Sequence, residues 1–119
     1  MPTRVLPQNS SRPVSALLVD RSREPWSLQG LASELGLSSR TLNRVIRRET
    51  GVSPMALLRQ ARLAQARAEL ELPRPGTTVT RVAFDCGFNH LGRFSVDYAR
   101  RFGESPSETL RRARRQRAA

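Results

Sequence analysis

The sequence predicts an all-α protein of about seven helices, arranged as two three-helix units joined by one long helix. Apolar residues recur at the spacing of a helix, and no alternating β-branched run is present. The glycines and prolines stand between these periodic stretches, where one helix ends and the next begins. A pattern of helix, glycine turn and second helix occurs twice, which predicts that the two units share one architecture.

The first half of the chain is predicted to contain a flexible polar leader and three helices. Ser27 is in a position to cap the second helix, and Ser38 or Ser39 the third, because a hydroxyl can accept hydrogen bonds from free N–H groups of the first turn. Gly36 and Gly51 stand where a residue with positive φ would end a helix. The predicted segments are the leader, 1–12, and the helices 14–21, 28–35 and about 39–50.

The second half is predicted to contain the long helix and three shorter ones. Ser53-Pro54 is a start signal, since serine caps a helix and proline suits its first position. The helix that follows is rich in Ala, Leu, Gln, Glu and Arg and should end before Pro73. Ser105-Pro106 opens the last helix, which leads into the arginine-rich C-terminus. The predicted helices are 54–72, 78–86, about 90–102 and a last one from 106.

Arginine carries all the basic charge of the chain. The sequence holds 21 arginines, no lysine and 10 acidic residues, for a net charge of +11. Residues 111–119 hold five arginines and no acidic residue, which is nearly half of the excess. We expect this C-terminal run to be a solvated, mobile tail that attracts phosphates without sequence preference. The surplus of positive charge indicates a polyanionic partner, with nucleic acid as the first candidate.

Composition and motif content argue against several other classes of protein. One histidine and one cysteine are too few for a metal centre, and no cofactor is expected. No Ser-His-Asp order, carboxylate pair or phosphate-binding glycine loop is present, so we do not expect an enzyme. No apolar run is long enough to cross a membrane, and the N-terminus lacks the apolar segment of a secretion signal. A cytoplasmic location fits best.

The lone cysteine and the aromatic residues are expected in the core. Cys86 lies in an apolar stretch, which favours an inert buried thiol over a redox sensor. The aromatic residues recur at helical spacing with aliphatic ones, which favours packing over base stacking. They are Trp26, Phe84, Phe88, Phe94, Tyr98 and Phe102.

An internal repeat indicates what the two units are. Each unit consists of a helix, a glycine turn, a second helix, a glycine stop and a Ser-Pro-capped helix, with one extra residue in the second copy. This is the helix-turn-helix pattern of homeodomain-like three-helix units, in which the second helix can lie in a DNA major groove. The alternative is an α-hairpin repeat that serves only protein packing. The matched pairs include Ala32 and Ala83, Gly36 and Gly87, Ser38 and Asn89, Leu42 and Phe94, Gly51 and Gly103, and Ser53-Pro54 and Ser105-Pro106.

Two stretches resemble the AraC/XylS family of bacterial transcription regulators: LASELGLSSRTLNRVIRRETGVSP and VTRVAFDCGFNHLGRFSVDYARRFGESPSETLRR. The match covers roughly residues 25–112. The resemblance implies two helix-turn-helix subdomains on a linker helix, with double-stranded DNA as partner and the second helix of each subdomain as a recognition helix. It also implies regulation of transcription initiation, most often activation, with RNA polymerase as a further partner.

Most members of that family carry an effector-binding or dimerisation domain ahead of this region, and we expect none in these 119 residues. The chain is then a fragment, a truncated gene product or a short stand-alone regulator. A helix of about 17 residues is about 26 Å long and could set the two recognition helices about 34 Å apart, one turn of DNA. The predicted organisation is a flexible leader (1–12), a first subdomain (13–52), a linker helix (53–72), a second subdomain (73–112) and a basic tail (113–119).

The first recognition helix is predicted to contact bases through Arg40, Asn43 and Arg44. These side chains share a polar face, whereas Leu42 and Ile46 turn inward. Arginine can donate two hydrogen bonds to guanine, and asparagine can pair with adenine. The alternative is a merely solvated basic face. The predicted phosphate contacts of this subdomain are Ser38, Ser39, Thr41, Arg47 and Arg48.

The second recognition helix has weaker candidates. Val96 stands at the position aligned with Arg44, where the resemblance implies arginine, and Asp97 follows it. We therefore expect this half to contribute phosphate and apolar contacts, for example to a thymine methyl group, more than guanine recognition. The predicted base contacts are Gly92, Arg93 and Ser95, and the predicted phosphate contacts are Asn89 and His90.

The predicted function is sequence-specific DNA binding by a bacterial transcription regulator that acts as an activator. Two alternatives come from other classes. One is a non-specific architectural or RNA-binding protein that acts through its charge and its tail. The other is a protein-interaction module whose basic surface binds an acidic partner.

Overall fold

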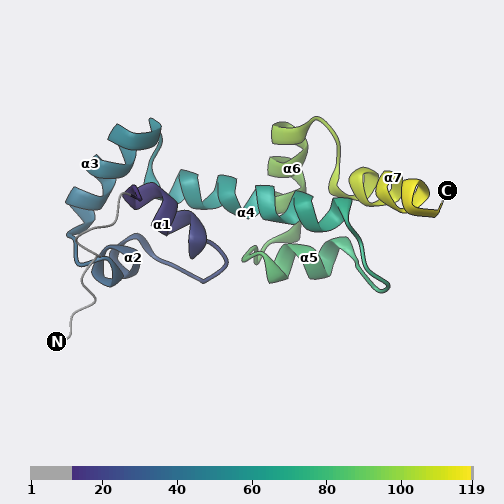
Figure 1. The fold of residues 1–119 in the computed structure, drawn as a ribbon, viewed down its shortest axis with the longest axis horizontal. Helices are drawn as coiled ribbons and strands as arrows, with labels where there is room; N and C mark the ends of the chain where they lie inside the picture. Colours follow the sequence, from purple (N-terminus) through teal and green to yellow (C-terminus); the bar gives the residue numbers. More distant parts are fainter. Residues whose placement is uncertain (1–11, 119) are drawn as a thin grey trace. The chain divides into compact units, whose positions relative to one another are not determined.

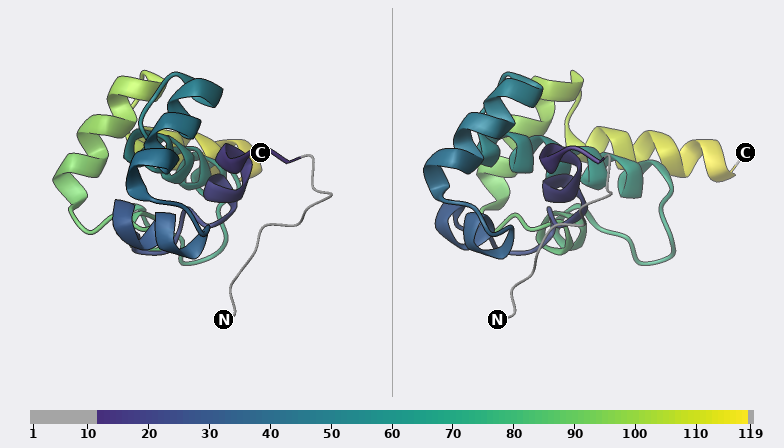
Figure 2. Two further views of the ribbon diagram at one scale, coloured as in Figure 1. Left: turned by 90° about the vertical axis from the view of Figure 1, so that its left-hand side faces the viewer. Right: turned by 60° about the vertical axis from the view of Figure 1, so that its left-hand side comes forward.

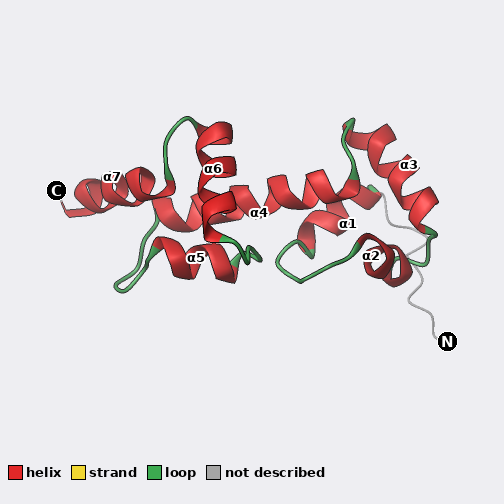
Figure 3. Ribbon diagram, turned by 180° about the vertical axis from the view of Figure 1, so that it is seen from behind, coloured by secondary structure: helices red, strands yellow, loops and turns green. Residues whose placement is uncertain are grey.

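The computed structural model describes residues 12–118, and the predicted leader, 1–12, lies almost wholly outside them. The described residues form seven α-helices and no strand, which confirms the all-α prediction (Figures 1 and 3). The helices are α1 (Val14–Asp20), α2 (Leu28–Glu34), α3 (Ser39–Thr50), α4 (Pro54–Glu71), α5 (Val79–Asp85), α6 (Leu91–Phe102) and α7 (Pro106–Ala118).

Two compact units divide the chain, one ending at Gln60 and the other beginning at Ala61. The division falls within α4, the helix predicted as a linker over 53–72. The first unit buries Leu58 of α4 in its core, and the second buries Leu63, Ala66 and Leu70 of the same helix. The long helix is therefore a structural part of both units.

The core of the first unit fixes which face of α3 is exposed. Leu42 and Ile46, four residues apart on α3, are fully buried with Leu18 of α1 and Leu31 of α2. The indole of Trp26 packs against this cluster, and its Nε1 donates a hydrogen bond to the carbonyl oxygen of Arg21 at 2.8 Å. A short turn joins α2 to α3 (Figure 2). Gly36, between the two helices in the sequence, has a φ of 73°.

Aromatic side chains dominate the core of the second unit. The rings of Phe94 and Tyr98 are fully buried on α6, with centroids 5.7 Å apart. Phe88 and Phe102 extend the stack, each with a ring centroid 4.7 Å from its neighbour. The guanidinium of Arg67 lies over the ring of Phe102, 4.7 Å from its centroid, which is a cation–π contact. The prediction that these aromatics pack rather than stack on bases is confirmed for the four rings.

The prediction for Phe84 is wrong, because its side chain is 52% exposed. Helix α5 buries Val82 and Ala83 and packs Val79 on the same core. Phe84 follows Ala83 by one residue, so it points about 100° away from that stripe. Cys86 is fully buried as predicted, and its Sγ lies 3.6 Å from Oε2 of Glu69.

Side-chain caps begin most of the helices as predicted. Hydroxyl oxygens of Ser27 and Ser38 accept hydrogen bonds from backbone N–H groups of α2 and α3. Thr78, predicted as the first residue of its helix, instead caps α5 in the same way. Ser53 does the same for α4, at 3.2 Å from the nitrogen of Ala56. These bonds satisfy N–H groups that have no partner inside the helix. Gly51 and Gly103 end α3 and α6 with φ of 83° and 78°, values that strain any other residue.

The expected mobile tail, 113–119, is instead helical as far as Ala118. Ala113 is buried, and Arg114 donates a hydrogen bond to the carbonyl oxygen of Thr77. Arginine, alanine and glutamine favour the helix, and no glycine or proline interrupts the segment. Basic side chains at this end also interact favourably with the helix dipole. Within residues 12–118, no helix is long and apolar enough to cross a membrane.

Candidate nucleic-acid interface

Helix α3 presents the basic surface that the sequence predicted. Because Leu42 and Ile46 are buried, the side chains of Arg40, Arg44 and Arg48 are exposed. None of these three arginines has an acidic partner among the described residues. Unpaired guanidinium groups keep their hydrogen-bond donors available for a base edge or a phosphate.

Asn43 and Arg47 interact with each other on this surface. Nε of Arg47 donates a hydrogen bond to Oδ1 of Asn43 at 3.2 Å, across one turn of α3. A bidentate contact of asparagine with adenine uses both the amide oxygen and the amide nitrogen. The predicted adenine contact of Asn43 therefore requires its amide oxygen to accept from adenine as well as, or in place of, Arg47.

The hydroxyl groups of Ser38, Ser39 and Thr41 at the start of α3 have different hydrogen-bonding roles. Oγ of Ser38 accepts from the backbone nitrogen of Thr41 at 3.0 Å and donates to Oγ1 of Thr41 at 2.9 Å. Ser38 is thus occupied as the helix cap, whereas the hydroxyl hydrogen of Thr41 is free to donate outward. Ser39 is partly exposed in the first turn, where backbone N–H groups and the helix dipole favour an anion. Ser39 and Thr41 fit the predicted phosphate contacts better than Ser38 does.

Glu49 has a structural role that the sequence did not indicate. Its carboxylate, at the end of α3, accepts hydrogen bonds from the backbone nitrogens of Val14 (3.3 Å) and Ser15 (2.8 Å) in α1. Helix α1 has no capping side chain from its own N-terminal neighbour, Pro13. The carboxylate therefore caps α1 and ties it to α3. The partners lie 34 and 35 residues apart, so no local motif reveals the contact.

Helix α6 begins at a histidine cap. Nδ1 of His90 accepts a hydrogen bond from the backbone nitrogen of Arg93 at 3.1 Å. The predicted start at His90 is thus shifted by one residue, and His90, rather than Asn89, corresponds to Ser38. Because Nδ1 is the acceptor, the neutral imidazole carries its proton on Nε2. The exposed Nε2–H is available as a donor to a phosphate.

The other predicted residues of the second half lie on or beside the same helix start. Asn89, Gly92 and Arg93 are exposed, and Ser95 is partly buried. Arg93 is the only basic residue in the first two turns of α6, where α3 has two. Asp97 offsets its charge on the same helix. The first two turns of α6 therefore carry less positive charge than those of α3.

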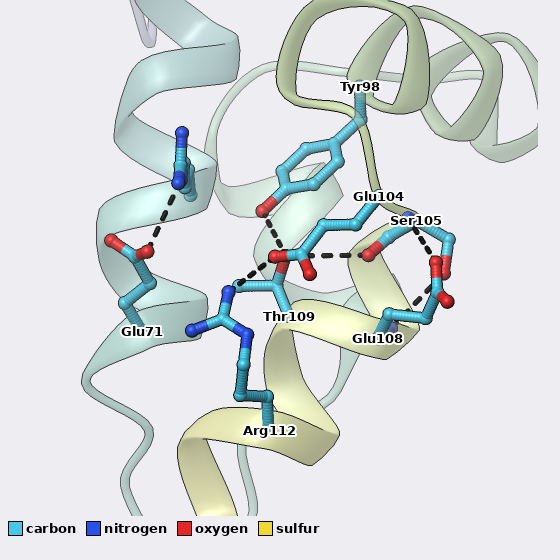
Figure 4. Close-up of polar contacts among 8 residues, drawn as sticks. Glu71, Tyr98, Glu104, Ser105, Glu108, Thr109 and Arg112 are labelled. Carbon is cyan, nitrogen blue, oxygen red and sulfur yellow. Dashed lines mark hydrogen bonds and ion pairs between the residues drawn. The ribbon is translucent and has the colours of Figure 1, made fainter.

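A network of hydrogen bonds connects α6 to α7 (Figure 4). The hydroxyl of Tyr98 donates to Oγ1 of Thr109 at 2.8 Å, and Thr109 donates in turn to the carboxylate of Glu104. The guanidinium of Arg112 donates to the same carboxylate. The network joins a fully buried tyrosine of α6 to α7 and to the turn between them. The sequence singled out Tyr98 as a core residue, but not its partners Thr109, Glu104 and Arg112.

The hydrogen bonds, charges and burial of the groups in this network shift their pKa values. Hydrogen bonds from Arg112 and then Thr109 lower the pKa of Glu104 below its ordinary value. The Glu104 carboxylate raises the pKa of Arg112, and burial raises the pKa of Tyr98. Nearby, Glu108 accepts from the backbone nitrogen of Ser105 at 2.7 Å, and this capping contact lowers the pKa of Glu108. All four groups are thus held in their usual charge states at neutral pH.

The described residues contain no group of three or more His, Cys, Asp or Glu side chains placed to hold a metal ion. The exposed side chains of α3, α6 and the His90 cap include guanidinium, amide, hydroxyl and imidazole donors. Such donors recognise phosphates and base edges.

A family model described as a helix-turn-helix domain matches residues 31–112. XylDLEGF operon transcriptional activator 3 of Pseudomonas putida is 37% identical over 100 residues, which cover 83% of this chain and 30% of that protein. The HTH-type transcriptional activator RhaS of Escherichia fergusonii is 39% identical over 93 residues, or 78% of this chain and 33% of that protein. The chain thus spans about a third of the length of these relatives.

Solved structures have the same fold. A protein described as a probable AraC family transcriptional regulator from Rhodopseudomonas palustris superposes with a TM-score of 0.74 at 40% identity, covering 84% of this chain and 93% of that one. The DNA-binding domain of AdpA, a global transcriptional factor solved in complex with a target DNA, gives a TM-score of 0.77 at 30% identity, covering 88% and 93%. Both the sequence and the fold match, so the chain belongs to the AraC family of helix-turn-helix transcription regulators.

Proposed function

We propose that this chain binds a specific sequence of double-stranded DNA and regulates transcription initiation, as an activator. The observation that carries the proposal is the face of α3, where Arg40 and Arg44 are exposed, have no acidic partner within residues 12–118 and lie opposite the buried Leu42 and Ile46. A rigid helix with unpaired arginines on one face has the chemistry of a major-groove recognition helix. The solved complex of the similar AdpA domain with its target DNA supports the same role.

Within α3, the residue types suggest a division of labour. The forked guanidinium groups of Arg40 and Arg44 suit guanine, and Asn43 suits adenine. Arg47 and Arg48 lie one turn further along and suit phosphates. Ser39 and Thr41 add hydroxyl donors at the helix start.

Within α6, the proposed contacts are mainly with the phosphate backbone. Asn89 and the Nε2–H of His90 are the phosphate donors at this helix start. The guanidinium of Arg93, predicted as a base contact, is a donor for either a base edge or a phosphate. Gly92 allows close approach of the backbone to a base pair, and Ser95 offers one hydroxyl. This half then positions the protein more than it recognises guanine.

We propose that the two halves occupy successive major-groove segments about 34 Å apart, so that a single chain binds one site with two boxes. The names of the relatives, which are transcriptional activators, support activation, with RNA polymerase as the further partner. A DNA partner in a bacterial cell implies a cytoplasmic protein.

Selection of bound fragments from a random duplex pool tests the proposal. We expect the purified chain to enrich one site that contains two boxes about one DNA turn apart. Recovery of unenriched sequence at moderate salt would contradict it. The five arginines of residues 111–119 support the alternative of non-specific binding. Competition with excess random duplex distinguishes specific from non-specific binding. Specific binding survives such competition, whereas architectural binding does not.

A further inference from the structure

The two recognition helices can be aligned residue by residue. Their caps, Ser38 and His90, are 52 positions apart, and so are their glycine stops, Gly51 and Gly103. The fully buried pairs, Leu42 with Phe94 and Ile46 with Tyr98, have the same separation. Both helices contain 12 residues. The extra residue of the second repeat therefore lies in the turn before His90, and the outward positions of α3 and α6 correspond without a gap.

One row of outward-facing positions carries hydrogen-bond donors in α3 and none in α6. In α3 it carries three arginines, and in α6 the corresponding positions carry no side-chain donor at all. Val96, at the position of Arg44, is 52% exposed. The rows are Arg40, Arg44 and Arg47 in α3, and Gly92, Val96 and Ala99 in α6.

Val96 is the only side chain larger than a methyl group in the α6 row. Gly92, one turn before it, has no side chain. An exposed isopropyl group can neither donate nor accept a hydrogen bond. The one base feature of the major groove that complements it is the C5 methyl group of thymine.

We propose that Val96 is a specificity-determining residue that contacts the C5 methyl group of one thymine in the second box of the DNA site. This inference rests on the proposed function and names the chemistry by which its weaker half recognises sequence. The second box is then recognised by an apolar contact at the position where the first box is recognised by a guanidinium group.

Deoxyuridine substitution provides the direct test, because deoxyuridine differs from thymidine only in lacking the C5 methyl group. Each thymine of the selected site is replaced singly, and the dissociation constant of the 119-residue chain is measured for each duplex. We expect one replacement in the second box to weaken binding about fourfold, the loss that burial of one methyl-sized group gives. Val96→Ala should bind the unmodified site more weakly and lose its sensitivity to that replacement.

Two further variants test whether the effect is specific to Val96 and to the second box. Arg44→Ala should alter base preference in the first box and leave the deoxyuridine effect in the second unchanged. Val96→Arg restores the arginine of the first repeat and should change the preferred base at that position from thymine to guanine in a new selection. Val96 is exposed, so unchanged thermal unfolding should verify that both of its variants fold.

A selected site that is insensitive to deoxyuridine throughout its second box would overturn this inference alone. Unchanged deoxyuridine sensitivity in Val96→Ala would do the same. Failure to select any site would instead overturn the proposed function, and this inference with it.

Discussion

The Nε atom of Arg47 donates a hydrogen bond to Oδ1 of Asn43 at 3.2 Å, so two residues assigned to different parts of the DNA are paired in the free protein. The pairing holds both side chains on the exposed face of α3. It also occupies one of the two amide positions that adenine recognition needs. The two residues are therefore expected to contribute to binding in measurably different ways.

Asn43→Ala is expected to relax specificity at one A·T pair and to cost about 1–3 kcal/mol on the selected site. Arg47→Ala is expected to weaken binding to all sequences and to reduce the salt slope by about 1, because it removes one phosphate contact. Binding isotherms at several salt concentrations, on the selected site and its single-base variants, measure both effects. A change of base preference in Arg47→Ala with an unchanged salt slope would refute this assignment.

Arg44→Ala and Arg93→Ala are expected to differ in the same measurements. Arg44 lies among unpaired arginines on α3, and its loss should relax the preference for one guanine at a cost of about 1–3 kcal/mol. Arg93 is the only basic residue in the first two turns of α6, and its loss should weaken binding to all sequences. Equal losses with the same base-substitution profile would show that the two halves do not differ in this way.

His90→Ala is expected to lower the free energy of unfolding by about 0.5–2 kcal/mol, since it removes the side chain that caps α6. His90→Asn should recover most of this stability, because asparagine is a good capping residue, but it lacks the imidazole donor. Urea denaturation of the three proteins measures the cap, and DNA affinity compared between wild type and His90→Asn isolates the imidazole. If His90→Ala proved as stable as the wild type, the cap would have no energetic role.

The lowered pKa of Glu104 predicts that stability falls in acid. A carboxyl group whose pKa is lower in the folded chain contributes stability that is fully present above its ordinary value of 4.5. That contribution is lost as the pH falls from 4.5 through the lowered value, and Glu108 acts in the same direction. Denaturant unfolding at a series of pH values from 7 to 3 should show a smaller acid loss in Glu104→Gln. A glutamine variant with the same dependence below pH 4.5 as the wild type would exclude this carboxyl as a source.

Local signals in the sequence were enough to predict most of the helix boundaries and the internal repeat. Ser27, Ser38 and Ser53 accept hydrogen bonds from N–H groups in the first turn of the helix that each caps, and a glycine stop needs only its own φ. The buried stripes of α3 and α6 follow from spacings of four residues. The face of α3 that carries Arg40 and Arg44 was predictable for this reason, since burying one side of a helix exposes the other.

Other features were decided only by segments that are distant in the sequence. Glu49 caps α1 across more than 30 residues, and Arg114 reaches the carbonyl group of Thr77 across 37. Phe84 is exposed because the second core was filled by the rings of α6 and by Phe88, and α5 turned only its other face inward.

The sequence by itself thus determined the fold class, the two repeated units and the side of α3 that faces outward, because these depend on interactions within about one helical turn. Tertiary structure decided that His90 rather than Asn89 caps α6, which places the extra residue of the second repeat in the turn before the cap. Tertiary structure also decided that the C-terminal arginines belong to a helix. The physical reason is that packing between elements distant in the sequence selects among local alternatives that the chain itself leaves nearly equal.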